Sequence, residues 1–414
     1  MKLSFKYKPK MNNKTIVIIE ELSFHTTKLY NSANYNCREN KFTNYVTMNT
    51  LYSDNWHKQF LHSHTYQHCL KVLEQNWKSF FAAIKDYSKH PEKYKAAPQP
   101  PKYKNKKNKN EIIYTNLAIR VRDNTLMLSL SKAMQDKFKV KSLNFNLSDK
   151  IKSLVNLDSI QQIKIQWDSI LKEWSLIIIY NQPTASLQTG SNIMSIDLGL
   201  DNLATMTFSE SNDCYIVNGK PLKSVNSYYN KEIAALQSIR MKQVGSTKFK
   251  DTNRITRLRR ARSNYIKDYI HKASREIINI ALSQNVSEIV IGDISGIKQD
   301  SAIKSFVQVP IQRLVELIEY KAALIGITVN KEKEAYTSGV SAIDLEPVTK
   351  EYYNKARRVT RGLFVTNTGI KINADVNGSL NILRKYLQNK CIPKLIISAR
   401  DNGLVNSPIR IRVA

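Results

Sequence analysis

The chain has 414 residues, and 42% of them are hydrophobic, which is enough to bury a sizeable core and excludes wholesale disorder. Its 64 Lys and Arg residues outnumber 34 Asp and Glu residues, giving a formal net charge of +30. A charge of this size opposes compaction unless a polyanion neutralises it, so we expect nucleic acid as the partner.

The cysteines and the N-terminus exclude several classes of protein. No Cys-x-x-Cys pair occurs, which argues against a disulfide framework and against an all-cysteine zinc site. His62, His64 and His68 lie near Cys69 in an amphipathic stretch without a second cysteine, so we expect no metal there. The start of the chain has no apolar signal core, and no run approaches about 18 apolar residues. We therefore expect an intracellular protein that does not associate with membranes.

The first half of the chain alternates between strand and helix patterns. Residues 1–20 alternate and then run apolar, which predicts one or two strands. Residues 23–89 have a helical pattern in which Trp77, Phe80, Phe81 and Ile84 share one face, as core residues do. Residues 112–182 again predict strands, at 118–122, 125–130, 162–166 and 173–180. Together with residues 1–20, these strands suggest one small barrel that the helical stretch interrupts.

A basic linker separates the helical stretch from the later strands. Residues 98–109 are stiffened by proline and then densely basic, with one aromatic residue among the lysines. The segment is either a solvated linker or a contact to a phosphate backbone, and we favour the contact. The candidate binding residues are Tyr103, Lys104, Lys106 and Lys107.

The second half has the element order of an RNase H-like α/β domain. A strand at 193–201 runs into a turn, and 204–208 is its hairpin partner. The remaining predicted elements, in chain order, are helices at 222–243 and 254–284, a strand at 288–293, a helix at 309–325, a strand at 328–336 and a helix at 374–387. Doubly wound folds share much of this order, so the order alone does not identify the fold.

The second of these helices begins with a cluster of arginines. Residues 254–262 hold five arginines and no acidic residue, whereas a solvated helix face normally mixes signs. We therefore expect contact with a nucleic-acid duplex through Arg257, Arg259 and Arg260.

Two carboxylates stand where the chain can hold them rigidly. Asp197 ends an apolar strand, and Gly199 lets the backbone turn away so that a phosphate can approach. Asp375 lies in the first turn of a helix, where the dipole stabilises its ionised form and Asn373 or Asn377 can orient it. If they meet across a sheet, they form an all-oxygen site suited to Mg²⁺. The alternative is a turn aspartate and a helix cap that are unrelated.

A resemblance to a known family bears on this choice. Ser195–Gly199 and Asn373–Ile382 resemble the first and last RuvC motifs of the TnpB (OrfB) proteins of insertion sequences. Those proteins are similar to Fanzor nucleases and to type V CRISPR effectors. The resemblance extends to four further segments and so covers nearly the whole chain: Trp77–Phe81, Pro100–Lys104, Glu334–Ser338 and Arg357–Phe364.

The resemblance implies an activity and a set of partners. It implies an RNA-guided double-stranded DNA endonuclease, encoded by a transposon, that recognises a short motif beside its target. One RuvC site would use Mg²⁺, as two ions about 3.5–4 Å apart. The guide RNA would come from the transposon end, and the protein would act as a monomer with that RNA. Such a protein works at the nucleoid in bacteria, or in the nucleus for eukaryotic or viral relatives.

The resemblance also implies a multidomain α/β architecture. A wedge-like β-barrel and an inserted helical recognition domain would hold the RNA scaffold and the heteroduplex, beside an RNase H-like (RuvC) nuclease domain. The expected boundaries are 1–20 with 110–185 for the barrel, 21–109 for the helical domain, 186–335 with 371–390 for RuvC, 336–370 for a target-nucleic-acid-binding insertion, and 391–414 for a C-terminal tail.

The catalytic glutamate departs from the commoner family pattern. On the middle strand, Gly292 stands where that pattern has glutamate, and glycine offers no ligand. Some relatives carry a relocated glutamate just before an Ala-Tyr-Thr-Ser-like motif, and Glu334 occupies that position. The resemblance thus implies Asp197, Glu334 and Asp375 as catalytic metal ligands, with Asp293 outside the primary set. The alternative is that Glu334 is a solvated residue of a Lys-Glu-Lys-Glu run.

The insertion also departs from the family pattern. Many relatives carry two Cys-x-x-Cys pairs there, but this chain has no cysteine between Glu334 and Asp375. We therefore expect no zinc, and we expect Arg357, Arg358 and Arg361 to approach substrate phosphates.

Two other functions remain open from the sequence. One is an RNA-guided but cleavage-dead DNA-binding transcriptional repressor, which Gly292 favours and the carboxylate trio opposes. The other is a DNA-transposing recombinase, which also uses three carboxylates on an RNase H-like fold.

Overall fold

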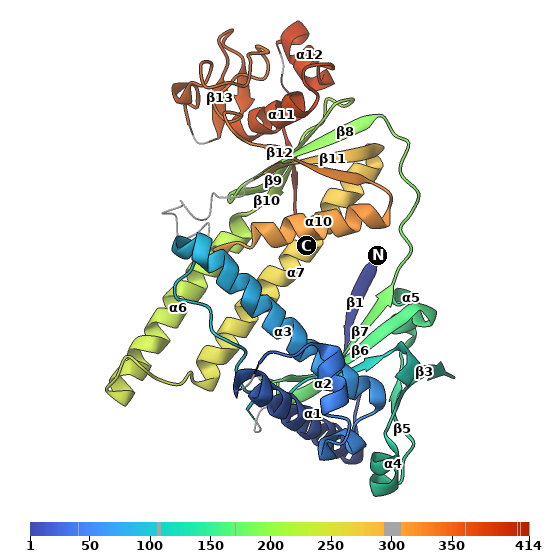
Figure 1. Cartoon of the computed structure of the whole chain (residues 1–414). Coiled ribbons are helices and arrows are strands. Elements are labelled where there is room, and N and C mark those ends of the chain that lie inside the picture. The colour runs from blue at the N-terminus through green and yellow to red at the C-terminus, as the bar shows by residue number, and fades with distance from the viewer. Residues whose placement is uncertain are drawn as a thin grey trace. The chain divides into compact units, whose positions relative to one another are not determined.

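The chain divides into two compact units in the computed structural model, Met1–Gln182 and Pro183–Ala414 (Figure 1). The structure describes residues 1–39, 41–105, 109–169, 171–293, 308–360, 362–403, 405 and 407–413. None of the described helices is both long enough and apolar enough to span a membrane.

The first helix of the first unit begins earlier than the sequence predicts. The described helices of this unit are α1 (Asn13–Glu39), α2 (Tyr45–Leu51), α3 (Ser63–Lys89) and the short α4 (Lys132–Phe138) and α5 (Asp149–Leu154). A strand expected at 15–20 is wrong, because these residues form early turns of α1. Ile18, Ile19 and Leu22 are buried along one face of that helix, so burial outweighs the strand preference of a β-branched run.

The strands of the first unit form two sheets. The first has the order β1-β7-β6-β2 and consists of β1 (Lys2–Tyr7), β2 (Ile112–Thr115), β6 (Ile160–Asp168) and β7 (Glu173–Asn181). The second consists of β3 (Ile119–Arg122), β4 (Thr125–Ser129) and β5 (Ser142–Asn146). The N-terminal strand pairs antiparallel with β7, so the predicted union of the two chain segments is confirmed. The strands are divided between two sheets, where we expected a single barrel.

The aromatic stripe on α3 is only partly core. Trp77 is buried, and its indole N–H donates to Asn34 Oδ1 at 3.0 Å. Phe81 and Ile84 are 44% and 38% exposed, so their predicted burial is wrong. Helical spacing places these side chains near one another, but it does not show how far the packed surface extends along the helix.

The second unit is built on a six-stranded mixed sheet with the order β12-β11-β8-β9-β10-β15. The strands are β8 (Asn192–Leu198), β9 (Asn202–Phe208), β10 (Tyr215–Asn218), β11 (Val286–Asp293), β12 (Thr328–Lys333) and β15 (Ile409–Ile411). The hairpin of β8 and β9 is antiparallel as predicted, and β11 runs parallel to both β8 and β12. Parallel strands bring their carboxyl ends to one edge of the sheet. Asp197 and Asp293 lie at the carboxyl ends of β8 and β11, and Glu334 directly follows β12.

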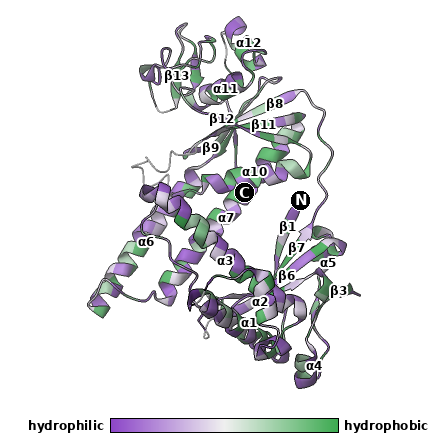
Figure 2. Ribbon diagram, in the orientation of Figure 1, coloured by the Kyte–Doolittle hydropathy of each residue, from purple (hydrophilic) through white to green (hydrophobic). Residues whose placement is uncertain are grey.

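The described helices of this unit are α6 (Lys220–Val244), α7 (Asn253–Ser283), α10 (Ile311–Leu324), α11 (Ala374–Tyr386) and α12 (Lys394–Asn402). Helices α7, α10 and α11 pack on the strands. Helix α11 packs on β8 and β9, while α7 and α10 pack together on the other side (Figure 1). Figure 2 shows hydrophobic and hydrophilic residues interspersed along α7 and α10, as in helices that bury one side only.

Candidate active site

Asp197 is held by a rigid strand and a close helix. It is the sixth residue of β8, whose apolar residues Ile196 and Leu198 are buried. A side chain at Gly378 of α11 would place its Cβ 3.0 Å from Asp197 Oδ2, so glycine there allows the helix to approach. Behind the carboxylate, the hydroxyls of Ser195, Thr207 and Ser379 lie within 2.9 Å of one another. These contacts fix α11 against β8 and β9.

Asp375 occupies the first turn of α11, as predicted. Asn373 is the N-cap, and its side chain accepts hydrogen bonds from the backbone N–H groups of Asp375 and Val376. Both carboxylate oxygens of Asp375 have partners: Arg358 Nη2 donates to Oδ1 at 2.8 Å, and Asn202 Nδ2 donates to Oδ2 at 2.6 Å. Asn202 and Arg358 therefore set the orientation of this carboxylate.

Glu334 lies one residue beyond β12, and its side chain fills the space beside Gly292. A Cβ at position 292 would overlap Oε1 of Glu334 and would lie 2.8 Å from both Cγ and Cδ. The glycine that removes the usual ligand is therefore the residue that makes room for this carboxylate. Oε1 of Glu334 is buried and has no hydrogen-bond partner among the described residues. A buried, unpaired carboxylate oxygen is costly unless a cation or a proton satisfies it.

The carboxylates act on one another electrostatically. Burial, and then the charges of Glu334 and Asp375, raise the pKa of Asp197 well above its usual value. Burial, and then the charge of Asp293, raise the pKa of Glu334 to about 7. Mutual repulsion of this kind shows that all four acids lie within electrostatic reach of the same region.

A cavity of about 470 Å³ opens beside Asp375. Lys220, at the start of α6, and Arg410, on β15, line it together with Arg358. Sequence analysis did not identify Lys220, Arg410 or Asn202, because each is a single polar residue outside any motif. The strand β15 adds Arg410 by pairing parallel with β10, a contact between residues almost 200 positions apart.

The insertion is tied down by a buried ion cluster. Glu346 accepts from Arg357 Nη1 at 2.7 Å, from Asn367 Nδ2 at 2.7 Å and from the backbone N–H of Ser341 at 2.9 Å. Arg384 of α11, which is 2% exposed, donates to the carbonyl of Glu346 at 3.0 Å. Arg357 therefore holds the insertion together, whereas we expected it to face phosphates.

Two asparagines of α11 hold the start of the insertion. Asn377 donates to the carbonyl of Val340 and accepts from the N–H of Ala342. Asn381 donates to the carbonyls of Thr337 and Val340. Asn377 thus binds backbone of the insertion, and its predicted role of orienting Asp375 is wrong.

The other predicted nucleic-acid contacts have mixed surroundings. Tyr103 is 44% exposed with Arg38 over its ring, and the ammonium of Lys104 lies 4.4 Å from the ring centre of Tyr30. Arg257 is exposed, whereas Arg259 pairs with Asp251. Arg260 is half-buried. The contacts of all these residues to nucleic acid stay predictions. Lys106, Lys107 and Arg361 lie outside the described residues.

The three carboxylates of this site are the kind of ligand that a hard divalent cation prefers. Asp197, Glu334 and Asp375 supply only carboxylate oxygens, and the unpaired Oε1 of Glu334 points to a missing positive partner. In the part of the chain that the structure describes, no three His, Cys, Asp or Glu side chains stand close enough together to hold an ion as they are. Arg358 pairs with one carboxylate oxygen of Asp375, so that oxygen is already occupied in this arrangement.

Comparisons with known proteins match separate parts of this chain. Residues 177–298 match the family model OrfB_IS605, described as "Probable transposase", and residues 312–382 match the model "Cas12f1-like, TNB domain". The "TnpB-like protein ORF457" of Acidianus two-tailed virus is 27% identical over 205 residues. That match spans 47% of this chain and 42% of the viral protein, so it covers less than half of either.

The solved structures support the fold. The protein of a "Cas12f1-sgRNA-target DNA complex" superposes with a TM-score of 0.60 at 15% identity, covering 89% of this chain and 82% of that one. The predicted fold class is confirmed: the chain is a multidomain α/β protein that shares the fold of that Cas12f1 protein. The two family models and the viral relative each match part of this chain, and they agree with the motifs quoted from the sequence, which resemble those of the TnpB (OrfB) family.

Proposed function

We propose that this chain is an RNA-guided endonuclease that hydrolyses double-stranded DNA beside a short adjacent motif, with Asp197, Glu334 and Asp375 as its Mg²⁺ ligands. The observation that carries the proposal is the placement of Glu334 over Gly292, with a buried Oε1 that has no described partner. A solvated glutamate of a charged run would have neither the burial nor a pKa raised to about 7.

The family and the charge support the partners. The net charge of +30 suits a guide RNA and a DNA duplex, and the structural relative was solved with an sgRNA and target DNA. We propose the same two classes of partner here, with a transposon-end RNA as guide. The domain limits and the monomer–RNA assembly expected from the sequence remain part of this proposal.

Each side chain of the site has a role that follows from its contacts. Bound Mg²⁺ would supply a water of lowered pKa and charge stabilisation for the leaving oxygen. Asp197 is held in place by β8 and the close approach of α11, while Asn202 keeps Asp375 oriented through Oδ2. Lys220 and Arg410 line the cavity on the side where a phosphate would enter. Arg358 would leave Asp375 as that carboxylate binds the cation, and would then pair with substrate phosphate.

One observation favours the cleavage-dead alternative. As the structure stands, the described carboxylates do not form a ready metal cluster, and Arg358 occupies Asp375. A protein that binds guide-matched DNA without cutting would keep these contacts permanently.

The test is cleavage of a guide-matched plasmid with Mg²⁺, by the full chain assembled with its RNA. We expect the wild type to cut and Glu334→Ala to cut at least about 100-fold more slowly while still binding the target. Glu332→Ala is the matched control, because Glu332 lies on the same strand but pairs with Lys385 at 3.3 Å. Its rate should stay close to that of the wild type.

The outcomes separate the alternatives. If Glu334→Ala cuts at the wild-type rate, Glu334 is not a ligand and the carboxylate trio is wrong. If the wild type binds the target and never cuts, the protein is the cleavage-dead binder.

A further inference from the structure

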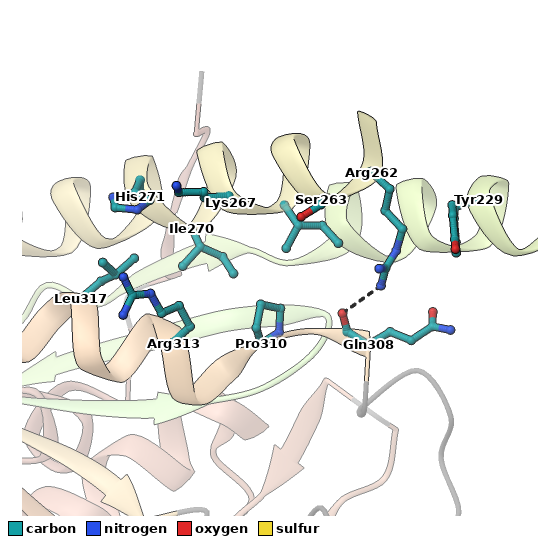
Figure 3. A pocket seen from close by; sticks show the side chains of 11 residues that line it. Tyr229, Arg262, Ser263, Lys267, Ile270, His271, Gln308, Pro310, Arg313 and Leu317 are labelled. Atoms are coloured by element: carbon teal, nitrogen blue, oxygen red, sulfur yellow. Dashed lines mark hydrogen bonds between the residues drawn. The ribbon is translucent and has the colours of Figure 1, made fainter. Parts of the chain in front are cut away.

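A second cavity lies beside α7 and α10, and none of the residues that line it is a carboxylate of the candidate active site. It has a volume of about 620 Å³ and runs between α7 and α10, with the side chain of Tyr229 from α6 at one end (Figure 3). Pockets for small organic ligands commonly have volumes of about 300–1,000 Å³. The space is therefore large enough for one nucleotide.

The lining of this groove carries positive charge. Arg262, Lys267 and His271 from α7 face Arg313 from α10, and no described lining residue is acidic (Figure 3). Arg313 donates to Glu316 at 2.8 Å, but both side chains of that pair are about half exposed, so the attraction is screened by water.

A buried lysine strengthens this charge from behind. Lys321 is 4% exposed, and its ammonium donates to the carbonyl of His271 and to Ser274 Oγ, both at 2.6 Å. Burial, and then the charge of Arg275, lower the pKa of Lys321 to about 8. Burial, and then Lys321, Lys267 and Arg313, lower the pKa of His271, while Asp268 opposes them weakly. Lys321, Lys267 and Arg313 therefore lie close enough to His271 to disfavour its protonated form.

The same groove has an apolar floor and a flat end. Ile270 and Leu317 are buried and line it from the two facing helices, together with Pro310 (Figure 3). At the end, the guanidinium of Arg262 lies 4.8 Å from the ring centre of Tyr229. Asn226 Oδ1 and the carbonyl of Gln308 hold that guanidinium in place, at 2.7 and 3.4 Å. An aromatic ring with a fixed guanidinium is a surface on which a nucleobase stacks.

We propose that this groove binds one unstacked nucleotide of a single-stranded nucleic acid. The base lies on the apolar floor against Tyr229 and Arg262, and its phosphate pairs with Lys267 and Arg313. An apolar ligand would offer no anion to Lys267 and Arg313, and an inorganic anion would leave the apolar floor uncovered. A nucleotide supplies both an anion for the basic side chains and a flat base for the apolar floor. RNA and DNA strands present the same kinds of base and phosphate.

Photocrosslinking tests the proposal directly. Single-stranded oligomers of about 12 nucleotides, one of RNA and one of DNA, each carry 5-iodouridine and are irradiated with the full chain. We expect a crosslink to Tyr229, located by mass spectrometry of the digested protein. The strand that crosslinks more efficiently identifies the natural source of the nucleotide.

Affinity variants test the chemistry independently of cleavage. The double change Lys267→Glu with Arg313→Glu should weaken binding of the preferred oligomer about 10-fold or more. Lys272→Glu is the matched control, because Lys272 lies on the same helix, is 50% exposed and does not line the groove. Tyr229→Ala should weaken binding about 5- to 100-fold, and Tyr229→Phe should retain it, because the ring alone supplies the stacking.

Several results would overturn the proposal. These are the absence of a crosslink from either strand, equal losses for the groove variants and Lys272→Glu, or equal affinity for an oligomer of abasic sites. The last result would reduce the groove to a phosphate contact. Thermal unfolding of each variant shows that its loss of binding does not come from loss of the fold, and none of these readouts depends on an active nuclease.

Discussion

The second unit gathers charges of one sign at two places. Burial, and then neighbouring acids, raise the pKa values of Asp197 and Glu334 at the sheet edge. Beside the groove between α7 and α10, burial, and then neighbouring bases, lower the pKa values of His271 and Lys321. Each arrangement costs folding stability, and each becomes favourable when a ligand of opposite charge arrives.

The ion cluster of the insertion provides the contrast. There Glu346 is paired with Arg357, and Arg384 bonds to its backbone, so opposite charges are buried together. Both carboxylate oxygens of Glu346 accept hydrogen bonds, whereas Nε of Arg384 has no partner among the described residues. The difference teaches that charge density alone does not mark a binding site, whereas like charges held together by the fold do.

The largest expected effect comes from breaking the negative cluster at Gly292. In Gly292→Ala the new Cβ overlaps the carboxylate of Glu334 and must push it away. We expect cleavage of guide-matched plasmid to fall about 100-fold, because a displacement of about 1 Å at a catalytic group costs that much. Guide-dependent binding of the target, measured by gel shift, should not change.

A double-mutant cycle makes this prediction specific. On a Glu334→Ala background, Gly292→Ala should have no further effect, because the carboxylate with which it clashes is gone. If the glycine change slows the residual activity of that background equally, the effect comes from β11 itself and the reciprocal placement is wrong.

A smaller effect should appear in the pH dependence of stability without metal. The pKa of Glu334 is about 7 in the folded chain, so between the usual pKa of a glutamate and about pH 7 the folded state binds more protons than the unfolded state. The stability of the metal-free wild type should therefore fall as pH rises from about 5 to 8, by on the order of 1–3 kcal/mol from this group. Glu334→Gln should lack that part of the decline in chemical denaturation.

Metal provides the control for this measurement. Mg²⁺ needs ionised carboxylates, so adding it should stabilise the wild type more at pH 8 than at pH 6, and should stabilise Glu334→Gln less. Parallel pH curves for the two proteins would show that Glu334 titrates normally and is not buried among acids.

The sequence predicted the elements that apolar runs define. The strands at Asp197 and Gly292, the hairpin of β9 and the long helices of the second unit are where the patterns placed them. The short strands β10 and β15 were missed, because three or four residues carry too little periodicity, and the nine-residue helix α12 was missed as well. The early start of α1 was missed because local strand preference and tertiary burial conflict there.

The sites show the same limit. The carboxylates were found through motifs, since Asp197 and Asp375 sit in fixed local contexts of strand end and helix start. The reciprocity of Gly292 and Glu334 is a contact across two strands, which spacing along the chain does not encode. The groove was not foreseen at all, because Tyr229, Lys267 and Arg313 come from three helices and belong to no motif.

The smallest expected effect concerns the arginines at the start of α7, which were predicted as one group. Arg259 pairs with Asp251, whereas Arg257 is exposed and has no ion pair with any described residue. An arginine whose charge is already compensated releases fewer counterions when it meets a phosphate, so the two positions should differ. Arg257→Ala should make the negative slope of log K against log salt shallower by about 1 for a duplex without a target sequence. Its loss of affinity should be the same for all sequences. Arg259→Ala should change the slope less. Asp251→Asn should make the salt dependence steeper, because it frees Arg259 to bind phosphate. Titration of the full chain with labelled duplex at several salt concentrations measures all three, and equal slopes for the two arginine variants would show that Asp251 does not decide which basic residue meets the backbone.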